Sequence, residues 1–154
     1  MALTSSAAPI VSGEAGTGVG GSAMSYREGI YEAMALLNGE WVVAVLASLA
    51  TRPLKYMELR EEINLAEERR GWSSHARPVS QKVLSATLRR MRRDGLVTRS
   101  EEKASFNPVW YELTPLGQTL LMSLRPVAKW AQGNRAEVEA ARARYEDEEL
   151  AERS

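Results

Sequence analysis

The sequence predicts an α+β fold that is mainly helical, and three features of its order support this class. Several short segments carry apolar residues three and four positions apart, which is the period of an amphipathic helix. A strongly cationic segment of the same kind follows them and ends at a glycine. Two five-residue segments then alternate apolar and polar side chains, as the strands of a half-buried hairpin do. The 154 residues are enough for one domain with a modest core.

Three short helices are expected before the cationic segment. Residues 1–23 are rich in Gly, Ser, Ala and Thr and predict a disordered tail, so order should begin near Ser25. The first helix ends at Asn38 and Gly39, the second ends before Pro53, and the third runs from about residue 55 to 63. Their expected core residues are Ile30, Ala33, Met34 and Leu37, then Trp41, Val42, Val45, Leu46 and Leu49, then Met57, Leu59 and Ile63.

Residues 80–94 predict the cationic helix. The hydroxyl of Ser80 can cap its first turn, and Gly95 can end it because glycine takes the left-handed conformation without steric cost. The spacing puts three apolar residues on one face, namely Leu84, Leu88 and Met91. The other face and its flanks carry Lys82, Ser85, Ala86, Arg89, Arg90 and Arg93, with Gln81 and Arg92 nearer the apolar edge.

Residues 96–100 and 109–113 predict the hairpin, because the segment between them is rich in turn formers and ends in a proline. Arg99 and Lys103 are its candidates for contact with an anion, although Glu101 and Glu102 lie nearby and oppose that role. Three helices, a cationic helix and a hairpin, in this order, are typical of a winged helix-turn-helix, which presents one helix to a DNA groove.

Charge supports double-stranded DNA as the partner. Residues 77–103 contain eight Lys and Arg against three acidic residues, whereas the whole chain has 20 of each sign. A duplex backbone attracts a local positive patch of this kind, and the arginines at the far end of the helix would meet phosphates. A winged-helix module that binds a protein and not DNA is the alternative.

Residues 65–78 are less regular and contain Trp72 and the single histidine, His75. They favour an extended turn whose charged first half prolongs the third helix; a loop that is ligand-gated or touches DNA is the alternative. His75 has no cysteine or acidic partner at a ligand spacing, so no metal site is predicted.

A long apolar helix is expected after the hairpin. Thr114 can cap it, with Pro115 at the first helical position, where its missing N–H is harmless. Pro126 should kink or restart this helix, and Gly133 with Asn134 predicts a break before a charged helical extension over residues 133–154. Its apolar stripe is Leu116, Leu120, Leu121, Leu124, Val127, Ala128 and Ala131, continuing through Trp130. A small domain spanning residues 25–132 cannot cover this stripe alone, so a subunit interface is expected.

Composition excludes several functions. The chain has no cysteine, which excludes disulfides, thiolate metal sites and thiol redox sensing. No nucleophile, acid–base pair or metal site stands out, so neither an enzyme nor a cofactor is predicted. Nothing reaches the length of a transmembrane helix and the first residues make a poor signal peptide, so a cytoplasmic protein without a membrane partner is expected.

Several motifs resemble those of the HxlR-type winged helix-turn-helix transcriptional regulators of bacteria, across roughly residues 31–130. They are NGEW at 38–41, LR at 59–60, SQKVLS at 80–85, LR at 88–89, DGLVTR at 94–99 and YELTPLG at 111–117. The resemblance implies a homodimer on a near-palindromic site, with N-terminal helices and the helix after the wing forming the dimer, and it leaves a small-molecule effector open. It also implies that Ser80, Gln81, Lys82, Ser85 and Arg89 face the major groove, with Arg99 on the wing.

The chain departs from this family at three points. Glu40 stands where the family usually has a basic residue, so a phosphate contact there is not expected. Residues 65–78 are longer than the usual turn, and the cysteine that many relatives carry near the N-terminus is absent. Oxidant sensing is therefore not expected. MarR-like and PadR-like winged helices are the nearest alternatives.

Overall fold

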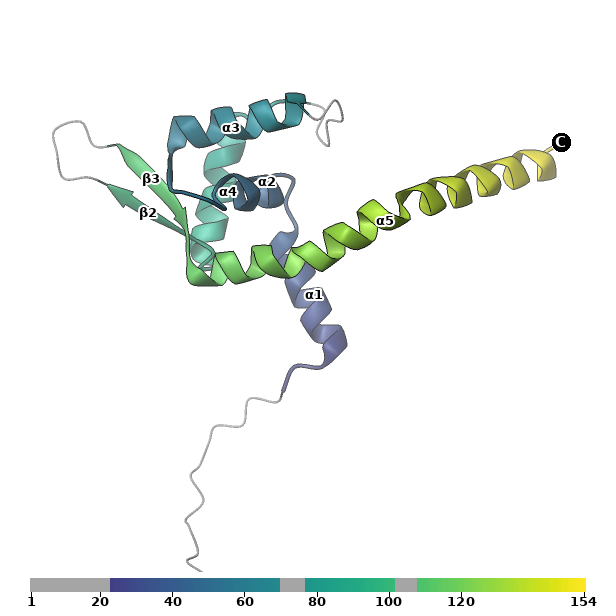
Figure 1. The fold of residues 1–154 in the computed structure, drawn as a ribbon, viewed down its shortest axis with the longest axis horizontal. Helices are drawn as coiled ribbons and strands as arrows, with labels where there is room; N and C mark the ends of the chain where they lie inside the picture. Colours follow the sequence, from purple (N-terminus) through teal and green to yellow (C-terminus); the bar gives the residue numbers. More distant parts are fainter. Residues whose placement is uncertain (1–22, 70–76, 102–107) are drawn as a thin grey trace, which may run out of the picture.

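The computed structural model describes residues 23–69, 77–101 and 108–154. Residues 1–22 of the tail expected over residues 1–23 lie outside the described residues, as do Trp72, His75, Glu102 and Lys103. Within the described ranges the order is α1 (Tyr26–Leu37), α2 (Val42–Ser48), β1 (Leu54–Lys55), α3 (Tyr56–Arg69), α4 (Gln81–Arg93), β2 (Val97–Glu101), β3 (Val109–Leu113) and α5 (Pro115–Glu152) (Figure 1). The mainly helical α+β class, with a winged helix-turn-helix, is confirmed.

The sheet has three antiparallel strands in the order β1-β3-β2. The expected hairpin is present, with Val97 opposite Leu113 and Glu101 opposite Val109. Strand β1 was not expected: Leu54 pairs with Tyr111 and Lys55 with Trp110, so Lys55 belongs to the sheet and not to the third helix. Two residues are too few to show the alternation that predicts a strand.

One apolar core joins α2, α3, α4 and the sheet. Trp41, Leu59, Leu84 and Leu88 are among its buried residues, as expected. The third helix extends to Arg69, which confirms that the charged first half of residues 65–78 prolongs it. Met57 was expected to be buried and is 55 % exposed instead, because the helix begins at Tyr56 and turns that ring toward the core.

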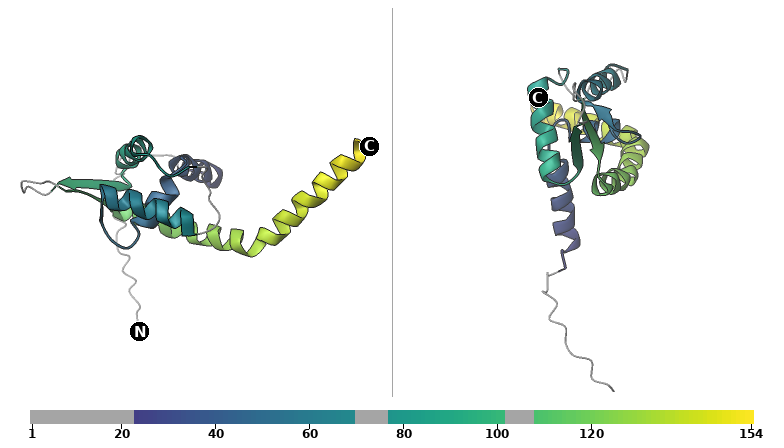
Figure 2. Two further views of the ribbon diagram at one scale, coloured as in Figure 1. Left: turned by 90° about the horizontal axis from the view of Figure 1, so that it is seen from above. Right: turned by 90° about the vertical axis from the view of Figure 1, so that its left-hand side faces the viewer.

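Helix α1 projects from the domain (Figures 1 and 2) and buries none of its residues. Ser25 and Glu28 form a capping box at its start, and the hydrogen bond from the Ser25 backbone N–H lowers the pKa of the Glu28 carboxyl. Ile30 and Met34 were expected in the core, but their side chains are exposed. Only Leu37, at the end of the helix, packs partly against the core.

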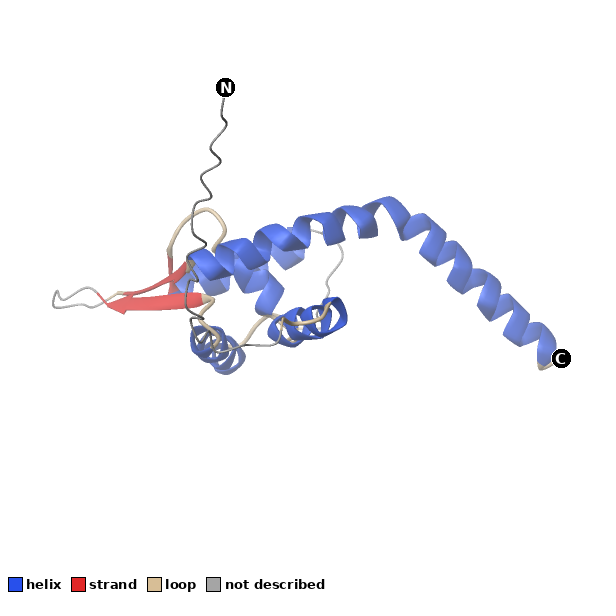
Figure 3. Cartoon of the chain, turned by 90° about the horizontal axis from the view of Figure 1, so that it is seen from below, coloured by secondary structure: helices blue, strands red, loops and turns tan. Residues whose placement is uncertain are grey.

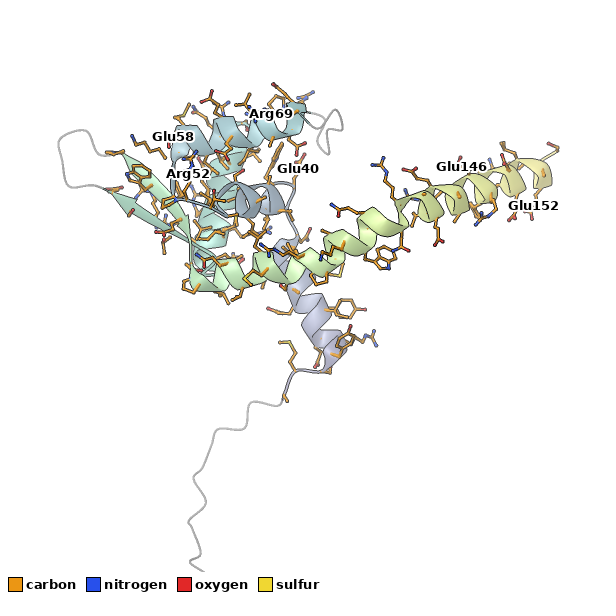
Figure 4. The ribbon with its side chains drawn as sticks, in the orientation of Figure 1. Glu40, Arg52, Glu58, Arg69, Glu146 and Glu152 are labelled. Atoms are coloured by element: carbon orange, nitrogen blue, oxygen red, sulfur yellow. The ribbon has the colours of Figure 1, made fainter. Side chains whose placement is uncertain are left out.

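Helix α5 is continuous from Pro115 to Glu152, so the break expected at Gly133 and Asn134 is wrong. It bends part-way along without ending (Figures 2 and 3). Pro126 lacks the N–H that would bond to the preceding turn, and the Asn134 amide donates to the Trp130 carbonyl at 2.7 Å. Both features can bend a helix without ending it. The charged extension thus continues the same helix away from the domain, where Glu146 and Glu152 lie (Figure 4).

No single helix of the described ranges is long and apolar enough to cross a membrane. Helices α1 and α2 meet the same length and composition test only as a pair, bent by 80° where they join. Several residues of α2 lie in the core described above.

Candidate nucleic-acid interface

Helix α3 holds the residues that lead into α4. The Arg60 Nε donates to the Val79 carbonyl at 3.1 Å, and the Val79 N–H donates to the Asn64 side-chain oxygen at 2.8 Å. The Val79 side chain itself is buried in the core. Both backbone groups of one residue are therefore fixed by α3, immediately before α4 begins.

Tyr56 makes the next contact between the two helices. Its hydroxyl donates to the Gln81 carbonyl at 2.9 Å and lies 3.0 Å from the Ser85 hydroxyl oxygen. Since the phenol has one hydrogen, and that hydrogen goes to Gln81, Ser85 is the donor in the second bond. The ring also lies 6.2 Å from that of Tyr111 on β3. The first turns of α4 are thus anchored to both α3 and the sheet.

The exposed start of α4 carries two of the expected base-reading residues. The Ser80 hydroxyl accepts from the Val83 N–H at 3.3 Å, which confirms Ser80 as the N-cap. Gln81 and Lys82 are exposed, with Gln81 Nε2 4.0 Å from the Met57 sulfur. Ser85 is half-buried and engaged with Tyr56, so among these polar side chains Gln81 and Lys82 are the more accessible.

The end of α4 is fixed as firmly as its start. Gly95 has φ of 75°, and the helix closes with bonds from the Leu96 N–H to the Met91 carbonyl and from the Gly95 N–H to the Arg92 carbonyl. The Thr114 hydroxyl donates to the Gly95 carbonyl at 2.6 Å and accepts from the N–H of Gly117. Helix α4, the hairpin and α5 therefore meet at one hydrogen-bonded junction.

Four arginines gather beside this junction. Arg89, Arg92 and Arg93 from α4, with Arg99 from β2, line an open concavity of about 550 Å³. Val97 and Thr98 complete its lining. Figure 2 shows α4 at the outer edge of the domain beside the strands. All four arginines are exposed. Arg92 was not among the residues predicted from the sequence, because its position on the helix lies near the apolar edge.

Acidic neighbours moderate two of these arginines. Arg99 forms an ion pair with Glu101, and this hydrogen bond raises the pKa of the Arg99 guanidinium further, so the group stays charged. Arg93 Nε lies 3.2 Å from a carboxylate oxygen of Asp94. Both guanidiniums are exposed, and such surface ion pairs are weak enough for a phosphate to compete for them.

Arg90 was expected to join this cluster but turns the other way. Its Nη2 donates to the Leu36 carbonyl of α1 at 3.4 Å, and the side chain is half-buried. Apart from Ser85, the other polar and basic residues expected on α4 are exposed. No cluster of three or more acidic, histidine or cysteine side chains that could hold a metal occurs in the part of the chain that the structure describes.

Comparison with known proteins matches the sequence to one family. A family model described as HxlR-like helix-turn-helix matches residues 36–139, more than half of the chain. The chain is 28% identical over 102 residues to BH0655 of Halalkalibacterium halodurans, an uncharacterized HTH-type transcriptional regulator, covering 66% of this chain and 79% of that one. It is 27% identical over 111 residues to YtfH of Escherichia coli strain K12, another uncharacterized HTH-type regulator, covering 72% and 78%.

Solved structures agree in fold. A transcriptional regulator of the MarR family from Enterococcus faecalis V583 superposes with a TM-score of 0.62 at 25% identity, covering 78% of this chain and 96% of that one. The regulator ytfH from Salmonella typhimurium gives a TM-score of 0.52 at 25% identity, covering 74% and 90%.

Proposed function

The chain belongs to the HxlR-like helix-turn-helix family and is a DNA-binding transcription regulator, and we propose that it acts as a homodimer that reads an inverted repeat. Helix α4 of each protomer enters the major groove, and the hairpin of β2 and β3 contacts the adjacent backbone. The arginine-lined concavity between α4 and β2 is the observation that carries this proposal.

On this proposal, the arginine-lined concavity provides the affinity for DNA. DNA presents a row of phosphates, and a protein that neutralises them gains free energy as condensed counterions are released. Arg89, Arg92, Arg93 and Arg99 offer guanidiniums that can bond a phosphate through two N–H groups. Lys103 and Ser80 stay predicted phosphate or groove contacts from the sequence. A module that binds only protein has no need for four arginines gathered between α4 and β2, and that alternative is not favoured.

Specificity comes from the start of α4, on this proposal. Helix-turn-helix proteins read base edges with the N-terminal residues of the recognition helix. Gln81 can pair with adenine and Lys82 with guanine, and both side chains are exposed. Ser85 contributes by holding Tyr56 and so the direction of the helix, and it contacts DNA less directly than we expected from the sequence.

Exposed apolar surface supports the homodimer. Met34 on α1 and Trp130 on α5 are 61 % and 63 % exposed, and Ile30 and Val127 on the same helices are also exposed. Each pair lies about one turn apart on its helix, and neighbouring exposed apolar side chains mark an interaction surface. A second copy of the chain buries them on both sides at once, as a two-fold interface requires.

Two further expectations accompany this function. The protein works on DNA in the cytoplasm and has no enzymatic activity, because a regulator of this kind needs only binding. A small-molecule effector would act by changing the arrangement of the two protomers.

The direct test is a gel shift on the DNA that flanks the protein's own gene, repeated across salt concentrations. The expected result is a discrete complex whose affinity falls log-linearly as salt rises, with an inverted-repeat footprint whose halves are centred about 34–36 Å apart. A complex that is insensitive to salt would contradict the cationic footprint.

A further inference from the structure

Arg90 contacts the end of α1 although it belongs to the recognition helix. Besides the bond to the Leu36 carbonyl, its guanidinium lies against Gly39, where an added Cβ would come within 2.9 Å of Nη2 and 3.1 Å of Nη1. The glycine therefore leaves the space in which the guanidinium sits.

The chemistry of this contact suits a helix end. Leu36 is the last residue but one of α1, so its carbonyl is among the four that have no donor within the helix. The C-terminal end of a helix also carries partial negative charge and favours a cation. Helix α1 has no basic residue in its own last turn. Arg90 supplies from α4 both the donor and the charge that α1 lacks.

The direction of α1 depends on contacts at this end. The helix buries none of its own residues, and Leu37 is its apolar side chain that packs partly on the core. A change at the junction of α1 with the domain would therefore swing the exposed residues Ile30 and Met34 through a large arc.

We propose that Arg90 is a positioning residue, which holds α1 at a fixed angle to the recognition helix and so sets the half-site spacing that the dimer selects. This rests on the proposed function, because it assigns α1 to the dimer interface. If α1 is held in one direction in both protomers, the two copies of α4 are held at one separation. A loose α1 lets the dimer accept several separations.

Two variants remove the contact in different ways. Arg90→Ala deletes the guanidinium, whereas Gly39→Ala displaces it and leaves every charge in the chain. The backbone of Gly39 is not in the left-handed region, so alanine fits its conformation, although Val42 Cγ2 would lie 3.0 Å from the new Cβ and must yield slightly. Arg90→Lys keeps the charge at the helix end and is expected to restore part of the function. Arg93→Ala, an exposed arginine of the same helix, is the matched control.

The first readout needs no DNA. The chain has no cysteine, so spin labels can be placed at Glu32→Cys on α1 and Gln118→Cys on α5, both exposed, in full-length protein diluted with unlabelled chain. Pulsed electron resonance should give a narrow distance distribution in the otherwise unchanged protein and after Arg93→Ala. It should give a broad one after Arg90→Ala or Gly39→Ala, at an unchanged melting temperature within about 5 °C. A distribution that stays narrow after Arg90→Ala overturns the proposal.

The second readout is selection from inverted repeats whose half-sites are separated by different numbers of base pairs. The unchanged protein should bind its preferred spacing about 10-fold or more tightly than the other spacings. Arg90→Ala and Gly39→Ala should each reduce this affinity ratio to about 3-fold or less. The salt slope should stay unchanged in both, whereas Arg93→Ala flattens it by about one unit.

Two results would distinguish a failure of the Arg90 proposal from a failure of the proposed function. If Arg90→Ala keeps the spacing preference and flattens the salt slope, Arg90 is a phosphate contact and the inference is overturned alone. If the unchanged protein binds no DNA, the proposed function fails and takes the spacing role with it, while the label distances still report whether Arg90 fixes α1.

Discussion

The phenol oxygen of Tyr56 lies 3.0 Å from the hydroxyl oxygen of Ser85, and this contact joins α3 to the second turn of α4. Together with the bond to the Gln81 carbonyl, it fixes the rotation of the helix that we propose enters the major groove. The side chains that we propose read the bases thus start from a backbone held by hydrogen bonds to α3.

Replacing Tyr56 by phenylalanine should loosen this start. The loss of two hydrogen bonds should lower the free energy of unfolding by about 1–2 kcal/mol, and operator affinity should fall more than affinity for random DNA. Tyr145→Phe is the matched control, since that hydroxyl donates to the Glu149 carboxylate within the projecting part of α5. Chemical denaturation and gel shifts give both values. A Tyr56→Phe protein as stable as its parent would show that the contact is dispensable.

The arginine concavity should control how binding depends on salt. Arg93→Ala and Arg99→Ala should each flatten the slope of log affinity against log salt by about one unit and weaken binding to all sequences alike. Arg144→Ala, on the projecting part of α5, should leave the slope as it is.

Removing the ion pair of Arg99 with Glu101 should raise the affinity for DNA, whereas the arginine substitutions lower it. Glu101→Gln frees the guanidinium and removes a negative charge near the backbone of the DNA. Affinity for any duplex should rise roughly two- to five-fold, within the range of one exposed charge interaction. Titrations at several salt concentrations test it, and weaker binding after this change would argue that β2 does not approach the phosphates.

Two glycines of α5 should respond to alanine in opposite ways. A Cβ on Gly117 would lie 2.2 Å from the Leu96 carbonyl oxygen, so Gly117→Ala forces the junction of α5 and the wing apart and should cost about 1–3 kcal/mol. A Cβ on Gly133 meets nothing within 4 Å, so Gly133→Ala should stabilise the helix by about 0.5–1 kcal/mol. Denaturant midpoints compare the two. Shifts of the same sign would contradict the packing described at Gly117.

Much of the fold could be predicted from the sequence, because the spacing of apolar residues differs between helices and strands. The caps at Ser80, Gly95 and Thr114 lie where local chemistry requires them, and the structure confirms each one. Strand β1 was missed because Leu54 and Lys55 are ordered by pairing with β3, which is far along the chain. The break expected at Gly133 was wrong, since one glycine in an otherwise strong helix costs too little to end it.

The candidate site was predicted less completely, because helix position does not fix where a long side chain points. Arg90 and Arg93 lie one turn apart on α4, yet one reaches back to α1 and the other borders the concavity. The hydrogen bond between the Tyr56 and Ser85 hydroxyls could not be predicted either, since it joins residues 29 positions apart. Such contacts depend on how α1, α3 and α4 pack.

The homodimer should depend on exposed residues of α1 and α5. Met34→Asp and Trp130→Asp should each yield a folded monomer, because these side chains have little contact within the protomer and a charge there opposes burial by a partner. Leu124→Asp should differ from these two variants and unfold the domain, since Leu124 packs partly against the core. Leu65→Asp, at an exposed apolar residue of α3, is the control. Sedimentation at micromolar concentration decides, and a monomeric parent protein would end the proposal.

The measurement that tests the central claim most directly is the ratio of operator affinity to random-DNA affinity after Gln81→Ala and after Lys82→Ala. Both residues are exposed at the start of α4, and a lost base contact costs roughly 1–3 kcal/mol. The ratio should therefore fall by about 10- to 100-fold in each variant while binding to random DNA changes little. If both variants lose operator and random DNA in equal proportion, the start of α4 only touches phosphates, and the claim that it reads the sequence is contradicted.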